Sequence, residues 1–164
     1  PTTMVASIGA STTDLTVVTD NHISFTRSIA TGGLALARAI ANDLGFELDQ
    51  AVEYMKTYGL DSTQLEGKVM QSIKPVFDVI VNEIRRALAY YQNKHPDKPV
   101  KRVILSGGTA KLPGIITYLA EALGLEVQVG NPWDGISLPQ SLSKRLIDEG
   151  TSYGVAVGLA LKQV

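Results

Sequence analysis

The sequence predicts an α/β fold, in which a mixed sheet of about five strands carries helices on its faces. Two observations support this prediction. Three short runs rich in β-branched residues stand together at the start of the chain, separated by brief turns of small or polar residues. After a helical middle section, the pattern becomes strand, helix, strand and helix. Hairpins make antiparallel neighbours and crossover helices make parallel ones, so both kinds of pairing are expected in one sheet.

The opening strands are expected at residues 4–8, 14–19 and 23–29. Residues 9–13 link the first two strands, and this linker contains Gly9 followed by small side chains. Asp20 and Asn21 form a short polar pair that suits a tight hairpin between the second and third strands. The start of the chain is therefore predicted to be a three-stranded antiparallel unit.

Three helices are expected next, at residues 34–44, 48–58 and 63–94. The first two are followed by Gly45 and Gly59, a residue type that favours helix termination. The third carries apolar residues at helical spacing that we expect to be buried: Val69, Ile73, Val76, Ile80, Ile84, Leu88 and Tyr91. Pro75 lies inside this third helix and predicts a kink or a helix boundary near residues 72–74.

The last part of the chain is predicted to alternate strands with helices. The strands are expected at residues 100–105 and 126–129, and the helices at residues 112–123 and 151–162, with a loop at 130–139. Gly154 and Gly158 stand four positions apart on the final helix, so they share one face. Such a face predicts a close-packing surface rather than a ligand site.

The composition excludes several classes of function. The chain has 164 residues, enough for one domain with a real core, and its net charge of −1 provides no electrostatic footprint for nucleic acid. No apolar stretch approaches the roughly 18 residues needed to cross a bilayer, so direct membrane insertion is not expected. Without cysteine, disulfides and thiolate metal sites are excluded. The isolated His22 and His95 are interpreted as solvated turn residues, and no metal site is predicted.

Two turns of small, glycine-containing sequence are the candidate functional features. VASIGASTTDLTVV (residues 5–18) returns from a strand into a strand, and RVILSGGTAKLPGI (residues 102–115) leads from a strand into a helix. A backbone without bulky side chains can approach a phosphate or a nucleoside closely. Each turn alone is also compatible with ordinary turn chemistry. Neither is a Walker A loop, and neither has the Rossmann G-x-G-x-x-G spacing.

Together these motifs resemble the second half of a protein of the actin-like ATPase superfamily. IGASTTDLTVV resembles the second phosphate motif of that superfamily, and VILSGGTAKLPG resembles its adenosine motif. EYMK, with Glu53 and Lys56 on one helix face, resembles its Ala-Glu-x-x-Lys helix, with Val52 at the alanine position. Within the superfamily, the resemblance favours the PilM family of type IV pilus assembly, which is related to FtsA. The short segment at residues 57–62 and the endings VGNPWDGISLP and YGVAVGLAL are similar to that family.

The resemblance implies an actin-like, ribonuclease H-like second domain over residues 1–164, with a core at 1–44 and 67–164 and a small inserted subdomain at about 45–66. It also implies an ATP site with Mg²⁺, complete only together with a first half that this chain lacks. The implied nucleotide-binding residues are Gly9, Ala10, Ser11, Thr12, Thr13, Gly32, Gly33, Glu53, Lys56, Gly107, Gly108, Thr109 and Lys111. Residues 9–13 would face the β and γ phosphates, residues 107–109 would pack the adenosine, and Glu53 with Lys56 would hold the ribose.

One residue departs from the superfamily pattern. An Asp normally stands two positions before the first glycine of the phosphate motif, where this chain has Ser7. That Asp is expected to hold the Mg²⁺ shell, and a hydroxyl supplies no charge for this purpose. Asp14 is interpreted as a residue that flanks the turn. The chain also begins with Pro rather than Met, so we expect a fragment or a processed product.

Three functions remain open at this point. The leading one is the ATP-binding half of a PilM-like scaffold, with at most weak ATPase activity, cytoplasmic and attached to the inner membrane through other pilus assembly proteins. The second is an interaction module of the same fold that has lost nucleotide, which Ser7 favours. The third is half of a small-molecule kinase, for which no catalytic Asp is identified. Self-association is left open by the resemblance.

Overall fold

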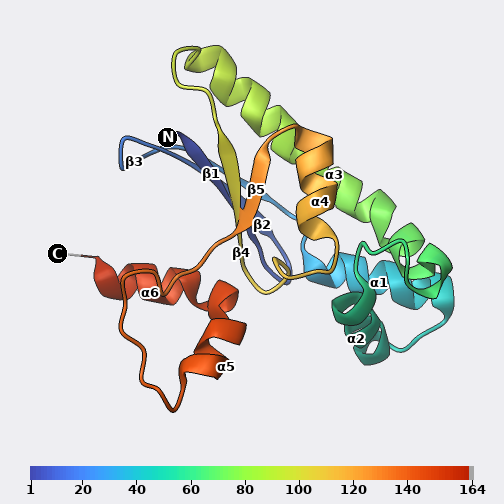
Figure 1. Cartoon of the computed structure of the whole chain (residues 1–164). Coiled ribbons are helices and arrows are strands. Elements are labelled where there is room, and N and C mark those ends of the chain that lie inside the picture. Colours follow the sequence, from blue (N-terminus) through green and yellow to red (C-terminus); the bar gives the residue numbers. More distant parts are fainter. Residues whose placement is uncertain (163–164) are drawn as a thin grey trace.

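A computed structural model, which describes residues 1–162, contains a five-stranded mixed sheet with helices around it (Figure 1). The strand order is β3-β2-β1-β4-β5. β1 (Thr3–Ile8), β2 (Thr13–Thr19) and β3 (His22–Ile29) form the antiparallel part. β4 (Arg102–Ser106) is parallel to β1, and β5 (Glu126–Val129) is parallel to β4. The predicted mixed sheet is therefore confirmed, with strand bounds within two residues of those expected from the sequence.

One face of the sheet carries the core. Alternate residues of each strand point to the same face, and those of β1 (Met4, Ala6 and Ile8) are fully buried. Leu15 and Val17 of β2 continue this layer, as do the apolar residues of β4. α1 (Gly33–Leu44), α3 (Lys68–Lys94) and α4 (Ile115–Leu123) supply the side chains packed against it. The hydrophobic alternation in the sequence thus sets which face of the sheet is covered.

The middle helices differ from expectation at their starts. α2 (Leu48–Tyr58) has the expected bounds, but α3 begins at Lys68, so the predicted start at residue 63 was wrong. Leu65 and Glu66 have positive φ values of 46° and 56° in the 3₁₀ turn Leu65–Gly67, which an α-helix cannot accommodate. Pro75 lies within α3, which continues through it, so no helix boundary falls at residues 72–74.

The C-terminal segment also differs from expectation. α4 begins at Ile115, after a turn that ends at Gly114 with a φ of 76°. The single helix predicted at 151–162 is divided into a 3₁₀ turn, Gly150–Tyr153, and α6 (Gly154–Leu161). The short helix α5 (Ser143–Asp148) was not predicted. Figure 1 shows α5 and α6, in red, on the side of the sheet away from α3 and α4.

The glycine face predicted on the last helix is only half realised. A Cβ built on Gly154 would lie 3.0 Å from the Ser106 Oγ, whereas one built on Gly158 meets nothing within 4 Å. α6 has apolar side chains all round, yet Val155 and Leu159 are 70% and 68% exposed. The close packing predicted for this face is therefore restricted to Gly154.

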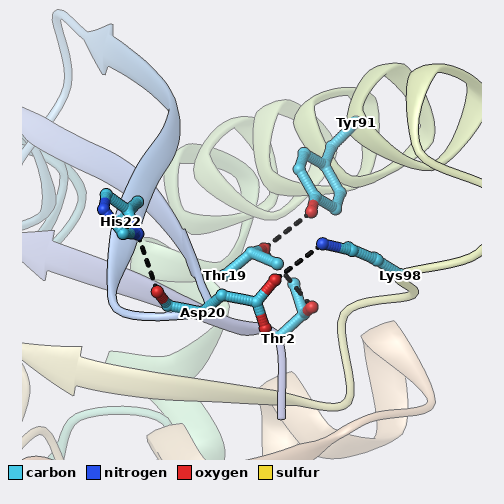
Figure 2. A network of polar contacts seen from close by, with 6 residues as sticks. All are labelled: Thr2, Thr19, Asp20, His22, Tyr91 and Lys98. Carbon is cyan, nitrogen blue, oxygen red and sulfur yellow. Dashed lines mark hydrogen bonds and ion pairs between the residues drawn. The ribbon is translucent and has the colours of Figure 1, made fainter.

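A polar network fastens the far end of α3 to the β2–β3 hairpin (Figure 2). The hydroxyl of the buried Tyr91 lies 2.8 Å from that of Thr19, which in turn donates to the Thr2 hydroxyl at 3.3 Å. Beside it, Lys98 forms an ion pair with Asp20 at 2.6 Å, and this hydrogen bond and charge lower the pKa of the Asp20 carboxyl. Asp20 and the next residue have positive φ, as the predicted tight hairpin requires.

Within residues 1–162, none of the helices combines the length and the apolar character that crossing a bilayer would require.

Replacing Tyr91 by Phe tests the network. The change removes the hydroxyl next to Thr19 inside a buried site, so we expect the free energy of unfolding to fall by about 1 kcal/mol. Urea denaturation measures it. Tyr90→Phe is the matched control, because Tyr90 is on the same helix and 51% exposed. Equal effects of the two substitutions would contradict a structural role for the Tyr91 hydroxyl.

Candidate functional site

The two small-residue turns meet at one edge of the sheet. β1 and β4 are parallel neighbours in which Ser7 is paired with Ser106, so both strands end at the same edge. The turn after β1 and the turn after β4 therefore leave the sheet side by side. Ligands of α/β proteins bind outside the carboxyl ends of parallel strands, since no side-chain layer covers this edge.

Main-chain contacts hold the two turns together. The Thr109 N–H donates to the Ile8 carbonyl at 3.1 Å. Gly107 has a φ of 88°, and a Cβ on it would lie 2.4 Å from the same carbonyl oxygen. Only glycine satisfies both demands without a shift of the backbone. The glycine after β4 is thus required by the contact with β1.

The start of α1 joins the same assembly. The N–H groups of Gly33 and Leu34 donate to the carbonyls of Gly9 and Ala10, both at 2.9 Å. A Cβ on Gly32 would lie 2.5 Å from the Gly9 carbonyl oxygen, so this position too admits no side chain. Three segments that are far apart in the sequence therefore pack backbone against backbone.

A pocket of about 390 Å³ opens beside this junction. It is lined by Ala10, Gly33, Leu34, Val52, Met55, Lys56, Gly108, Thr109, Lys111 and Leu112. The lining combines apolar side chains with two lysines and with small residues from both turns. Such a surface can hold a flat apolar ring system, and its cations can balance an anionic group.

The structure brings about half of the predicted site residues to this pocket. Those that line it are Ala10, Gly33, Lys56, Gly108, Thr109 and Lys111. Gly9, Gly32 and Gly107 lie behind them and set the backbone approach. Ser11, Thr12, Thr13 and Glu53 are not part of the lining.

The three hydroxyls of the first turn have different surroundings. The Thr13 side chain is buried, and its hydroxyl donates to the Thr31 carbonyl at 2.8 Å, so it stabilises the fold. The Thr12 hydroxyl donates to the Asp14 carboxylate at 3.2 Å. Ser11 is exposed beside it. Of the three, Ser11 and Thr12 are therefore the exposed ones.

Glu53 and Lys56 form an exposed pair on α2, 3.8 Å apart. Their side chains are 73% and 64% exposed, and an exposed pair of this kind adds little stability by itself. Lys56 lines the pocket, whereas Glu53 lies outside the lining. α2 packs next to α1, and this packing places the Glu53–Lys56 pair beside the pocket.

Sequence reasoning missed four apolar residues of the pocket, Leu34, Val52, Met55 and Leu112. A signal existed for two of them. Val52 and Met55 lie four and one positions before Lys56, so they share or border its helix face. Leu34 and Leu112 carry no such signal, because their place depends on how the turns fold.

Ser7 and Asp14 are direct cross-strand partners between β1 and β2. Opposite residues of an antiparallel pair share one face, so the carboxylate lies next to the serine position. Asp14 is exposed and stands at the start of β2, directly after the turn, where its carboxylate accepts a hydrogen bond from the Thr12 hydroxyl, in agreement with its interpretation as a residue that flanks the turn. Among residues 1–162, no three His, Asp or Glu side chains gather in a way that could hold a metal ion.

The comparison with protein families decides the assignment. The family model described as "Type IV pilus assembly protein PilM" matches residues 1–164, which is the whole chain. The chain belongs to the PilM family.

Related proteins agree with this assignment. The cell division protein FtsA of Neisseria meningitidis serogroup B is 26% identical, in a match that covers 78% of this chain and 36% of that protein. The solved PilM-PilN type IV pilus biogenesis complex has a TM-score of 0.83 at 28% identity, over 98% of this chain. The match covers 45% of the solved chain, so this PilM family member spans less than half the length of both relatives.

A more distant solved structure shows the fold alone. MreB 5 of Spiroplasma citri bound to AMPPNP has a TM-score of 0.70 at 14% identity, over 98% of this chain and 52% of that chain. Its likeness supports the actin-like fold. The predicted resemblance to PilM and to the actin superfamily is confirmed.

Gly32→Ala tests the backbone junction. The added methyl would meet the Gly9 carbonyl, and we expect the strain to lower the free energy of unfolding by about 1–3 kcal/mol. Chemical denaturation measures the change. Gly158→Ala is the control, because it adds a methyl in open space within a helix and should be neutral or stabilising. A fully stable Gly32→Ala variant would show that the three segments do not pack this tightly.

Proposed function

We propose that this chain is the nucleotide-binding half of a PilM-type scaffold of type IV pilus assembly, and that ATP is its ligand. One observation carries the proposal. The small-residue turns after β1 and β4 lie against each other, joined by hydrogen bonds to the start of α1, next to a pocket with two lysines. The matches to the PilM-PilN complex and to the PilM family support the biological role.

The pocket suits the adenosine part of a nucleotide. Its volume of about 390 Å³ lies in the range of small-molecule sites, and its apolar lining fits a base. We propose that the base lies against Val52 and Met55 and that Lys56, with Glu53 nearby, contacts the ribose. The main chain at Gly108 and Thr109 would form the other wall.

The phosphates would lie along the first turn. Gly9 and Ala10 offer main chain without bulky side chains, and the exposed hydroxyls of Ser11 and Thr12 can donate to phosphate oxygens. Mg²⁺ would enter with the nucleotide, since hard cations prefer phosphate and carboxylate oxygens. Asp14, the cross-strand partner of Ser7, would supply a carboxylate for Mg²⁺ beside the first turn.

The proposed role is a conformational switch, with hydrolysis slow or absent. Phosphoryl transfer requires metal, water and phosphate to be positioned together, and Ser7 supplies no charge where the superfamily has an Asp. We propose that the complete protein is cytoplasmic and associates with other inner-membrane pilus assembly proteins, as the PilM of the solved complex does with PilN.

ATP binding is the first test. This chain provides one wall of the site, so the contacts only partly offset the entropy lost on binding, and we expect a dissociation constant in the millimolar range or weaker. NMR titration with MgATP should shift the signals of residues 9–12, 33–34 and 107–111. A micromolar constant from calorimetry would contradict the one-wall arrangement, and unchanged spectra at high MgATP would favour an interaction module without nucleotide.

Two charge-reversal variants test whether ATP binds at the pocket or through nonspecific attraction. Lys56→Glu places a negative charge at the pocket, whereas Lys68→Glu makes the same change of net charge on an exposed lysine of α3. We expect the first variant to weaken ATP binding severalfold and the second to leave it unchanged. Equal losses would indicate nonspecific attraction between the protein and the nucleotide.

Ser7→Asp tests the metal side of the site. The new carboxylate would face Asp14, so we expect stability to fall by up to about 1 kcal/mol and the Mg²⁺ dependence of ATP binding to increase. Thermal melts and titrations at several Mg²⁺ concentrations measure the two effects. Ser7→Asn is the control, because asparagine has nearly the same shape as aspartate but carries no charge. A stable Ser7→Asp variant with unchanged Mg²⁺ dependence would show that position 7 is not near the metal.

A further inference from the structure

The pocket lies between two parts of the chain that are far apart in the sequence. On one side α2 contributes Val52, Met55 and Lys56, and on the other side the turn after β4 contributes residues that include Gly108 and Leu112. These two parts are called the walls of the pocket. A gap of about 0.5–1 Å on one face of a bound ring forfeits roughly a quarter to a half of the attraction of each atom pair. The separation of the walls therefore matters for a flat base.

Main-chain contacts join the two walls at one end of the pocket. Leu60 follows α2, and its N–H donates to the Pro113 carbonyl at 2.8 Å. A Cβ built on Gly59 would lie 2.7 Å from the Pro113 ring and 2.8 Å from its carbonyl oxygen. A Cβ built on Gly114 would lie 2.8 Å from the Leu60 carbonyl oxygen. Each glycine therefore leaves room for the segment opposite, and these four residues are called the wall contact.

The backbone conformation requires glycine at both positions as well. Gly59 and Gly114 have positive φ values of 45° and 76°, which L side chains rarely adopt. A side chain at either position would meet a steric clash and a strained backbone together. The wall contact thus depends on one glycine from each side.

The wall contact is joined directly to residues that line the pocket. The Gly59 N–H donates to the Met55 carbonyl at 2.9 Å. On the other side, Leu112 immediately precedes Pro113. Met55, Leu60 and Leu112 are all buried. Buried side chains are close-packed, so a shift of the main chain at the contact moves its neighbours instead of being absorbed by empty space. The contact is therefore placed to set the positions of Met55 and Leu112.

α2 is also attached elsewhere in the fold. It packs against α1 and, to a smaller extent, against α3, and its Ala51 belongs to the core. These contacts keep α2 on the domain whether or not the wall contact is intact. The wall contact differs from them, because it joins the end of α2 to the turn on the other side of the pocket. Its loss is therefore expected to change the width of the pocket rather than to unfold α2.

We propose that Gly59 and Gly114 are positioning residues of the site, which hold the two walls at the separation that the base requires, an inference that rests on the proposed nucleotide binding. Neither glycine lines the pocket itself. A pocket already held at the right width has less freedom to lose when a ligand enters, and this preorganisation strengthens binding. The effect is confined to the base, because the phosphates are proposed to lie along residues 9–12, which belong to a different turn.

Gly114→Ala tests the proposal in the whole chain. The added methyl would meet the Leu60 carbonyl oxygen, so the two walls should move apart. NMR titrations with three probes at matched Mg²⁺ measure the consequence: ATP, AMP and inorganic tripolyphosphate. We expect the dissociation constants of ATP and AMP to rise by roughly fivefold or more, because contacts to the base are lost. The dissociation constant of tripolyphosphate, which has no base, should remain unchanged.

Gly124→Ala is the matched control. Gly124 has a φ of 65°, close to the 76° of Gly114, and lies at the other end of α4, but an added Cβ there meets nothing within 4 Å. The two substitutions impose similar backbone strain, and only Gly114→Ala disturbs the wall contact. Gly59→Ala approaches the contact from the side of α2. Its control is Gly45→Ala after α1, where φ is also positive and the space is open. Both controls should leave the binding of all three probes unchanged.

Pro113→Ala is a milder test that applies if Gly114→Ala does not fold. It removes the ring that packs on Gly59 and keeps the carbonyl that accepts from the Leu60 N–H, so it loosens the contact without a clash. We expect the same selective loss of ATP and AMP binding, at smaller size. Thermal melts identify which variants are folded at the temperature of the titrations.

The outcomes separate this inference from the proposed function. A folded Gly114→Ala chain that binds ATP and AMP as the natural chain does would overturn the positioning role while the nucleotide site stands. An equal loss in Gly124→Ala, or an equal loss of tripolyphosphate binding, would also overturn it, since the effect would then not come from the width of the base pocket. If the natural chain binds neither ATP nor AMP, the proposed function is wrong, and this inference fails with it.

Discussion

The backbone contact at the ends of β1 and β4 is the constraint on which the rest of the candidate site depends. Here the Gly9 carbonyl receives the Gly33 N–H, the Ile8 carbonyl receives the Thr109 N–H, and Gly32 and Gly107 leave no room for a Cβ. This contact fixes the start of α1 and the turn after β4 relative to the sheet. The pocket and the lysines at its rim follow from that placement.

The two faces of the sheet are covered differently. The face toward α1, α3 and α4 holds the buried core, and the Tyr91 network fastens α3 to the hairpin on the same side. The opposite face carries polar residues such as Ser7 and Asp14 and is only loosely accompanied by α6. An apolar helix that remains exposed is unusual for a closed domain. This face is therefore the less covered of the two.

The local sequence predicted which helices and strands form better than it predicted the residues at which they begin and end. The bounds of α2 and β5 were as expected, since turn residues or glycines mark their limits. The predicted start of α3 was too early, because Leu65 and Glu66 adopt left-handed conformations that their residue types do not signal. The 3₁₀ turn ahead of α6 was missed for a similar reason. It is fixed by the hydrogen bonds from Gly107 and Ser106 to Thr151, which join distant parts of the chain.

The sequence by itself determined the fold class, the mixed sheet and the family, because hydrophobic periodicity and the glycine motifs are local properties. It also indicated Ala10, Lys56, Gly108 and Thr109 as site residues, which do line the pocket. Only the tertiary structure decided that Asp14 faces Ser7, that Leu34 and Leu112 complete the lining, and that Gly59 meets Pro113. Those relations depend on strand register and on the way a turn closes against its neighbours, and such long-range geometry is set by packing of the whole chain.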